Sequence, residues 1–461
     1  MKPQRLLAAV FSLVLSACGN LAGPDYQRPA VVEKETWTDT DVLSQSPAAT
    51  IRPDWWRNFG DPYLDKLMTR ALANNLDLRL LAARIGVAEA TIDQVNATRL
   101  PTIDTATGAS FQKAEGGDVN RAVSQATALG WEIDIWGRLN KGVQAQTAEF
   151  RATEADWRAG YLTLAADVST TYFSILQFDE QSDRQQQALI NNEETLSIYE
   201  NFFAEGLIAK TQVMQQQAEV NRLRRDQLEL ERLRELSENA LATLLGVPAG
   251  ELSVPMRHLS DSISPILVPG GLPAQLLSRR PDIIAAEYRV LQAHELVGQA
   301  RLAQLPSISL TANTGNTSVQ LADLLKTWTF GLTPAVNLPL FDPAVKARLR
   351  VSEAQTRVAE EQYRRTVMRA FEEVENALVN LSSRRRQHRQ VLERRDKLRV
   401  VSDQVSAHMR EGMVTQLEVF EAERSLLDAE LALLANHQLL LSDTVALYKA
   451  LGGGWPQQVV E

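Results

Sequence analysis

The sequence predicts an α+β membrane protein that is internally duplicated, with two strands and a long helical hairpin in each copy. Three observations lead to this prediction. Matching residues recur in the two halves of the chain at one spacing of about 205 residues. Apolar residues follow one another at steps of four and three over long stretches, which is typical of coiled-coil helices. Short segments with a period of two, typical of strands, follow a Leu-Pro pair in each half.

The composition is that of a folded protein with an acidic balance. The chain has 461 residues, of which 44% are hydrophobic and 23% are charged, enough to bury a large core. Its formal net charge of −9 argues against a nucleic-acid duplex as partner, because the protein as a whole would not neutralise the phosphates. An acidic conduit for cations is compatible with the same charge.

A lipoprotein signal is predicted at the N-terminus. Basic residues precede an apolar run at 6–15, and Leu-Ser-Ala-Cys at 15–18 resembles the bacterial lipobox, in which cleavage before the cysteine leads to its acylation. Residues 1–17 are therefore expected to be a signal peptide, and Cys18 the lipid-bearing end of the mature protein. The alternative is an ordinary signal peptide with an incidental thiol. Gly19 follows the cysteine, which favours sorting to the outer membrane.

The duplication sets the expected domain boundaries. The matched pairs include Asp77 with Asp282, Arg84 with Arg289, Leu100 with Leu305, and Gly206 with Gly412. We expect an extended, lipid-anchored segment at 18–62, a first repeat at 63–247, an equatorial linker at 248–278, a second repeat at 279–455 and a tail at 456–461. The first helix is predicted at 63–98, where Pro101 halts it, and its counterpart follows Arg-Pro-Asp at 280–282.

Alternating residues predict two strands after each Leu-Pro pair. Apolar residues at 129–135 alternate with Gly130, Glu132 and Asp134, which places acids on one face; 307–312 and 327–332 also alternate, and 102–112 alternates poorly. Turns between the strands are predicted at 116–118 and 313–317. One interpretation is a soluble sheet packed on helices. The other is a lipid-facing barrel wall, favoured by the export signal and by the lack of an apolar run of ~20 residues in the mature chain.

The long helices have narrow apolar seams. Helices are predicted at about 143–203 and 211–245, and along 344–451 in the second copy, with Val367, Phe371 and Val374 among the seam residues. A globular core would need a wider stripe, whereas a hollow tube one helix thick needs apolar seams only toward neighbouring helices. Four strands cannot close a barrel, which needs about eight, so several protomers are expected to share one.

Each predicted hairpin has a glycine at its tip, Gly206 in the first and Gly412 in the second, with Thr415 as a candidate N-cap of the next helix. Leu417 and Glu421 are four residues apart on that helix and therefore share one face. Two interpretations stay open. Either both side chains face a pore axis, or Leu417 packs in the seam and Glu421 is a solvated charge.

The sequence predicts no enzyme. Its five histidines share no metal-ligand spacing, and its one cysteine is assigned to the lipid, so no metal site and no cofactor other than that lipid are expected. No glycine-rich phosphate loop follows a strand, because the three glycines at 452–454 end a helix. Paired carboxylates such as Glu372 and Glu373 lie among arginines, where solvated ion pairs are expected.

Six motifs occur in order along the chain. They are Leu-Ser-Ala-Cys at 15–18, Gly-Pro-Asp-Tyr at 23–26, Trp-Trp-Arg-Asn-Phe-Gly-Asp-Pro at 55–62, Trp-Glu-Ile-Asp-Ile-Trp-Gly-Arg at 131–138, Arg-Arg-Pro-Asp-Ile at 279–283 and Leu-Tyr-Lys-Ala-Leu-Gly-Gly-Gly-Trp at 447–455. Over nearly the whole mature chain, the sequence resembles the TolC-like outer-membrane efflux proteins, in the lipoprotein branch typified by OprM and NodT.

The resemblance implies a homotrimer with a twelve-stranded outer-membrane β-barrel, four strands per chain, continued by a twelve-helix periplasmic α-barrel. It implies the exit duct of a tripartite efflux system, which passes small toxic compounds or drugs and is joined to a periplasmic adaptor and an inner-membrane RND-type transporter. In this branch a leucine and an acidic residue at the positions of Leu417 and Glu421 form constricting rings; Glu421 replaces the usual aspartate. The competing function is a periplasmic adaptor lipoprotein, against which the paired strands and the absence of a recognisable lipoyl-type β unit count.

Overall fold

The computed structural model describes residues 23–32, 34–39, 43–44, 51–113, 115–117, 119–259, 268–269, 273–320, 326 and 328–456. The predicted signal peptide and Cys18 lie outside the described residues. By its contacts the chain divides into two compact units. We call Met1–Val31, Ala83–Ala155 and Ile284–Thr366 the strand unit, and Val32–Ala82, Asp156–Ile283 and Val367–Glu461 the hairpin unit.

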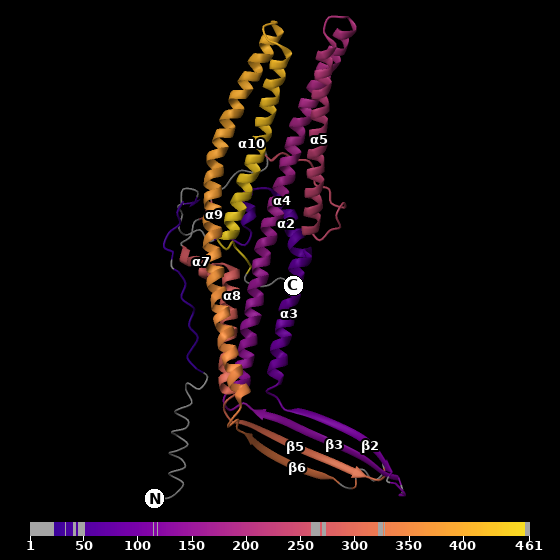
Figure 1. The fold of residues 1–461 in the computed structure, drawn as a ribbon, viewed down its shortest axis with the longest axis vertical. Helices are drawn as coiled ribbons and strands as arrows, with labels where there is room; N and C mark the ends of the chain where they lie inside the picture. The colour runs from indigo at the N-terminus through magenta and orange to yellow at the C-terminus, as the bar shows by residue number, and fades with distance from the viewer. Residues whose placement is uncertain are drawn as a thin grey trace. The chain divides into compact units, whose positions relative to one another are not determined.

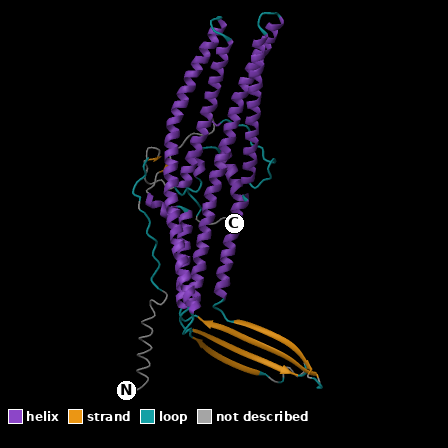
Figure 2. Ribbon diagram, viewed as in Figure 1, coloured by secondary structure: helices purple, strands orange, loops and turns teal. Residues whose placement is uncertain are grey.

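The strand unit contains a four-stranded antiparallel sheet in the order β2-β3-β5-β6 (Figures 1 and 2). Its strands are β2 (Thr102–Lys113), β3 (Val119–Ile133), β5 (Ser307–Ser318) and β6 (Thr329–Asn337). The hairpin β2-β3 comes from the first repeat and β5-β6 from the second, and β3 pairs with β5 across the repeats, with Trp131 opposite Leu310. The weakly alternating segment at 102–112 is therefore a strand.

The turn predicted at 313–317 is wrong, because these residues lie inside β5. Asn313 is paired with Ala128 of β3 on one side and with Gly331 of β6 on the other. Residues 313–315 are paired on both sides and 316–317 with β3 alone, and this strand pairing overrides the turn preference of the Asn, Gly and Thr residues.

Of the two acids predicted to lie on one face of a strand, Glu132 lies within β3, whereas Asp134 follows the strand and caps the next helix. β3 ends at Ile133, and α4 runs from Arg138 to Ala204. The Asp134 carboxylate accepts hydrogen bonds from the backbone N–H groups of Leu139 (3.1 Å) and Asn140 (2.9 Å). Glu132 pairs with Arg138 at 2.7 Å. The Asp134 carboxylate thus satisfies orphan N–H donors at the positive end of α4, whereas Glu132 keeps its place on the strand and pairs with a side chain of the first turn of α4.

The single helix predicted at 63–98 is two helices, α2 (Pro62–Asn74) and α3 (Leu76–Ala97). Asn75 interrupts them with an extended backbone, and its side-chain oxygen accepts the N–H of Leu78 at 2.9 Å. Asparagine competes well for helix ends because its side chain can bond the backbone locally. The second repeat has the same break, where Arg280 separates α7 (Pro273–Arg279) from α8 (Pro281–Leu302).

The two break residues make the same long-range bond. Asn75 Nδ2 donates to the carbonyl of Leu244, the last residue of α5 (Lys210–Leu244), at 3.0 Å. Arg280 Nη1 donates to the carbonyl of Ala450, the last residue of α10 (Gln416–Ala450), at 3.0 Å. Each bond satisfies a carbonyl that a helix end leaves unpaired. The duplication therefore extends to single hydrogen bonds.

Two helical hairpins, α4-α5 and α9-α10, make up most of the hairpin unit, and α9 runs from Pro343 to Arg410 (Figure 1). The seam residues follow the predicted spacing and are at most 8% exposed: Val367, Phe371, Val374, Leu378 and Leu381 on α9, and Trp157, Tyr161, Leu164, Val168, Tyr172 and Ile175 on α4. A buried cluster of Leu189, Val220, Leu223 and Leu427 joins α4, α5 and α10. No described helix combines the length and apolarity of a transmembrane span.

The segment that precedes the first helix is held by side chains of the second repeat. In the strand unit, Arg28 forms a bidentate ion pair with Glu287, in which Nη2 and Nε donate to the two carboxylate oxygens at 2.5 and 2.7 Å. In the hairpin unit, Lys34 and Thr38 both bond Glu375. A short parallel pairing of β1 (Leu43–Ser44) with β4 (Val268–Pro269) and the 3-10 helix η2 (Trp55–Phe59) complete the described elements.

We predict that Arg280→Met destabilises the hairpin unit by about 2 kcal/mol, because it leaves the Ala450 carbonyl unpaired and removes bonds to charged groups. Arg280 is 6% exposed and also pairs with Glu373 and Asp282, each at 2.7 Å. The midpoint of thermal unfolding of the detergent-purified protein measures the effect. The control is Arg369→Met, since Arg369 also pairs with Glu373 but its side chain is 78% exposed. Equal midpoints for the two variants would contradict the prediction.

Candidate functional site

The two hairpin tips have the same backbone geometry. Gly206 lies between α4 and α5 with φ of 73°, and Gly412 lies between α9 and α10 with φ of 74°. At the first tip the N–H groups of Gly206 and Leu207 donate to the carbonyls of Phe203 (2.9 Å) and Phe202 (2.8 Å). Gly412 and the residue after it bond in the same pattern, both at 3.0 Å. This is the Schellman termination, which needs a left-handed residue after the helix.

The second tip passes into α10 through a capping arrangement. Glu418 Oε1 accepts hydrogen bonds from the backbone N–H of Thr415 (3.2 Å) and from its hydroxyl (3.0 Å). A glutamate at the third helical position that reaches back to a threonine N-cap is half of a capping box, which fixes where the helix begins. The position of every side chain on the first turns of α10 follows from this start.

Leu417 and Glu421 lie on the outward face of those turns. Leu417 is 60% exposed and Glu421 is also exposed, whereas Val419 and Ala422, at 7% and 8% exposure, pack inside the hairpin unit. Within a single chain Leu417 is therefore not part of the buried seam. The structure brings the two side chains onto one exposed face at the end of the hairpin.

The first tip carries an apolar patch that sequence analysis missed. Phe202, Phe203 and Leu207 are 42%, 43% and 65% exposed. The sequence did contain a signal for this patch, namely two consecutive phenylalanines at the end of a helix. Adjacent residues point in different directions around a helix, so only one of the two can face a narrow seam and the other is expected to be exposed. Exposed aromatic side chains around a hairpin tip are suited to contact with another protein.

A buried ion network was also missed, because its members are far apart in the sequence. Arg257 Nη1 donates to both carboxylate oxygens of Asp61 (2.8 and 2.9 Å) and to the hydroxyl of Tyr172 (2.9 Å). The Tyr172 hydroxyl in turn donates to Asp61 at 2.8 Å, and burial is the main cause that raises the pKa of this phenol. Arg234 pairs with the buried Asp179 and donates to the Val254 carbonyl. The network fixes the start of the linker against α2, α4 and α5.

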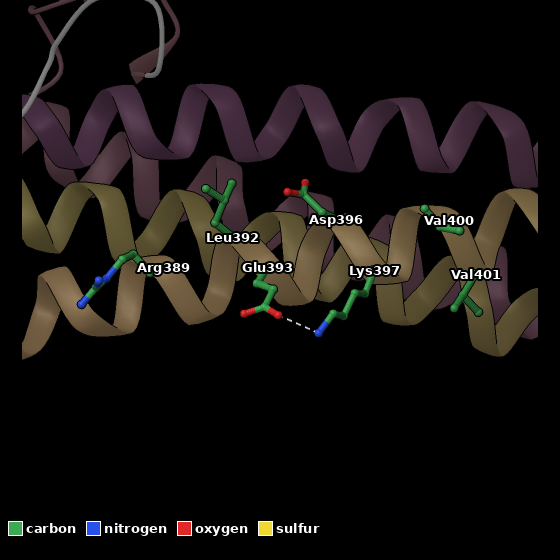
Figure 3. Close-up of a pocket in the computed structure, with 7 residues that line it drawn as sticks. All are labelled: Arg389, Leu392, Glu393, Asp396, Lys397, Val400 and Val401. Carbon is green, nitrogen blue, oxygen red and sulfur yellow. Dashed lines mark hydrogen bonds and ion pairs between the residues drawn. The ribbon is translucent and has the colours of Figure 1, made fainter.

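A shallow hollow runs along one face of α9 (Figure 3). It is lined by Arg389, Leu392, Glu393, Asp396, Lys397, Val400 and Val401, which all belong to this helix. Val400 and Val401 are 54% and 42% exposed, and Glu393 pairs with Lys397 at 2.7 Å. These residues are separated alternately by three positions and by one. In a coiled coil, residues with this spacing surround the holes into which side chains of a facing helix insert. The α9 face, defined by these seven residues, therefore has the form of an unfilled helix-packing surface.

A family model for the outer membrane efflux protein matches the chain in two segments, 67–247 and 272–453. The chain belongs to the outer membrane efflux protein family. The two segments begin and end at about the same spacing that separates the repeats, so both copies carry the family pattern. As a member of this family the protein is an outer-membrane efflux channel and not an enzyme, and membership decides against the periplasmic adaptor.

Relatives of this efflux protein match over its whole length. It is 30% identical to the probable efflux pump outer membrane protein TtgC of Pseudomonas putida, over 99% of this chain and 97% of the relative. It is 29% identical to the cation efflux system protein CusC of Escherichia coli O6:H1, over 99% of this chain and 100% of the relative. The solved open state of the MtrE outer membrane channel of Neisseria gonorrhoeae is similar with a TM-score of 0.84 at 29% identity, covering 95% of this chain and 99% of that one.

We predict that Gly412→Ala destabilises the second tip of this efflux protein by about 1–2 kcal/mol, the cost of a left-handed conformation for a residue with a Cβ. No atom lies within 4 Å of the added Cβ, so conformation is the only cost. The same substitution at Gly86, inside α3 and equally free of neighbours, should stabilise by about 0.5–1 kcal/mol. Hydrogen exchange of the last turn of α9 and thermal unfolding measure the two effects, and effects of the same sign would contradict the prediction.

Proposed function

We propose that this efflux protein is the outer-membrane exit duct of a tripartite pump, in which it works as a homotrimer with a periplasmic adaptor and an inner-membrane RND-type transporter. The match of the family model to both repeats carries the proposal. The relatives named for efflux systems support it, because they align with this chain from end to end. The cargo is the class of small toxic compounds or drugs.

In the proposed trimer, the four strands of each chain join those of two others in a twelve-stranded barrel in the outer membrane, and the hairpins form a twelve-helix tunnel in the periplasm. The sheet supports this proposal, because β2 and β6 are edge strands that closure would pair. Exposed apolar residues along β6, such as Phe330, Leu332 and Val336, alternate as a lipid-facing wall requires. The proposed domains remain those expected from the duplication, with 248–278 as the equatorial linker.

The helix that we propose to fill the α9 face is α5 of a second copy. Met214, Leu228 and Leu236 of α5 are 57%, 65% and 52% exposed, and their spacings of 14 and 8 residues keep them within about 80° of one another around the helix axis. They therefore share one face. In the hairpin unit α4 lies against both α5 and α10, so α5 and α9 are left as outer helices with apolar stripes available to other copies.

The gate of the proposed tunnel lies at the second hairpin tip, where Leu417 and Glu421 of three chains would form two rings. A ring of leucines closes a pore by excluding water, and a ring of carboxylates favours cations. The free face that both side chains occupy supports this assignment. The exposed aromatic patch of the first tip, at Phe202 and Phe203, is the surface that we propose for the adaptor.

We predict that Leu417→Ala with Glu421→Ala raises the resting conductance of the purified trimer in planar bilayers and lowers its preference for cations. The reason is that both constricting side chains are removed while the packed face of α10 stays intact. Met413→Ala with Glu411→Ala, which changes an apolar and an acidic residue in the turn itself, is the control and should keep wild-type conductance. Unchanged conductance and ion preference in the first variant, with the trimer intact, would place the constriction elsewhere.

We predict that Val400→Lys or Leu228→Lys weakens the trimer, because either places a charge in the proposed α5-α9 contact. Native mass spectrometry of detergent-extracted protein measures the trimer fraction. Leu439→Lys on α10, a site 40% exposed, is the matched control and should leave it unchanged. A stable wild-type monomer would refute the barrel and the tunnel together.

We predict that the mature protein begins at an acylated Cys18 inserted in outer-membrane lipid. Mass spectrometry of the N-terminal peptide tests this, and a peptide that begins elsewhere with an unmodified thiol would disprove it. Cys18→Ser should weaken membrane anchoring without dissolving the trimer, since the proposed barrel is itself embedded.

A further inference from the structure

A layer of polar residues interrupts the apolar seams of three helices in the hairpin unit. On α9, continuing the seam beyond Leu381 at steps of four and three places Arg385 and His388 at the next positions. On α10, the buried Asn436 and Gln438 lie between the apolar seam residues Leu434 and Leu441. On α4, Glu180 and Gln181 are 2% and 7% exposed. Apolar packing resumes on both sides, so the layer is local.

Hydrogen bonds cross this layer from helix to helix. Gln438 Nε2 of α10 donates to the hydroxyl of Ser174 on α4 at 3.0 Å, and Gln181 Nε2 of α4 donates to the Leu431 carbonyl on α10 at 2.9 Å. Between α9 and α10, His388 Nδ1 lies 3.2 Å from Asn436 Oδ1. A polar layer in a coiled coil fixes register but lowers stability.

Two histidines meet in the layer. The rings of His388 and His437 lie edge to face with their centroids 6.1 Å apart. His437 Nε2 is buried and makes no hydrogen bond in the described structure. The titratable groups that act on His437 are His388 from α9 and the buried Glu180 from α4. One helical turn away, Arg384 of α9 pairs with Asp443 of α10 at 3.4 Å.

Protonation of His437 opposes the observed packing. Burial first, and then His388, lower the pKa of His437 below its ordinary value, and Glu180 only partly offsets them. For a histidine whose folded pKa is lowered, the stability contribution is complete above the unfolded pKa of about 6.5 and is lost as the pH falls toward the folded value. Acid therefore weakens the α9-α10 contact at this layer.

We propose that His388 and His437 form a proton-sensitive hinge in the α9-α10 hairpin, which loosens when the buried His437 takes up a proton. The layer lies 22 residues from Thr415, which corresponds to roughly 33 Å of helix. A loosened layer at this distance frees the distal part of the hairpin, including its tip, while the apolar seams nearer to Tyr448 stay packed. The inference concerns this hairpin alone and does not depend on the proposed assembly or cargo.

Hydrogen exchange of the full mature protein in detergent, at about pH 7.5 and about pH 5.5, tests the hinge. We expect the protection factors of 384–392 and 433–441, corrected for the intrinsic effect of pH, to fall by roughly threefold or more on acidification. The double variant His388→Gln with His437→Gln, which keeps polar side chains that cannot ionise, should lose this response. His408→Gln, an exposed histidine on the same helix, should keep it.

Two results would overturn the hinge. One is a wild-type protein whose protection factors at 384–392 and 433–441 do not depend on pH. The other is a double variant that keeps the full acid response, which would assign it to other groups. If the double variant does not fold, the single variant His437→Asn takes its place with the same expectation. Exchange requires no pump and no cargo, so failure of the proposed function would leave this result unaffected.

Discussion

The narrow apolar seam is the constraint on which the rest of the structure depends. Val367, Val374 and Leu378 are buried along one narrow stripe of α9. A helix with so narrow a stripe can pack against neighbouring helices but does not have enough apolar surface to enclose a globular core. The hairpins therefore pack edge to edge, with α4 against both α5 and α10. The same constraint leaves the α9 face and the exposed apolar residues of α5 open within one chain, where the proposed trimer would cover them.

The ends of the helices are held by side chains that replace the missing intrahelical partners. Asn75 and Arg280 occupy equivalent places in the two repeats and bond the last carbonyls of α5 and α10. Both side chains donate a hydrogen bond to a helix-end carbonyl, but one is an amide and the other a guanidinium. The asparagine also caps α3, whereas the arginine adds ion pairs to Glu373 and Asp282 and so ties α8 to α9 as well. The duplication thus keeps backbone connections and varies the side chains that make them.

Polar groups inside the hairpin unit have two different roles. Around Asp61, Tyr172 and Arg257, every charge is paired and the network fixes the linker, as buried charges require if they are to be stable. Around His388 and His437, one ring nitrogen has no hydrogen-bond partner and the layer interrupts an otherwise apolar seam. The first arrangement ties the linker to three helices, and the second is the layer that we propose as a proton-sensitive hinge.

The sequence by itself determined the duplication, the long hairpins, the seam residues and the glycines at both tips, because each depends on local spacing or on one backbone conformation. The resemblance to outer-membrane efflux proteins could also be recognised from the sequence, because it rests on six motifs of consecutive residues. Only the tertiary structure showed that 313–317 lies within a strand, that Asp134 caps the start of a helix, and that Asn75 divides another. It alone brought Arg257 to Asp61 and His388 to His437. Such contacts join residues of distant segments, and no periodicity encodes them, since they arise only once the seams have set the helices side by side.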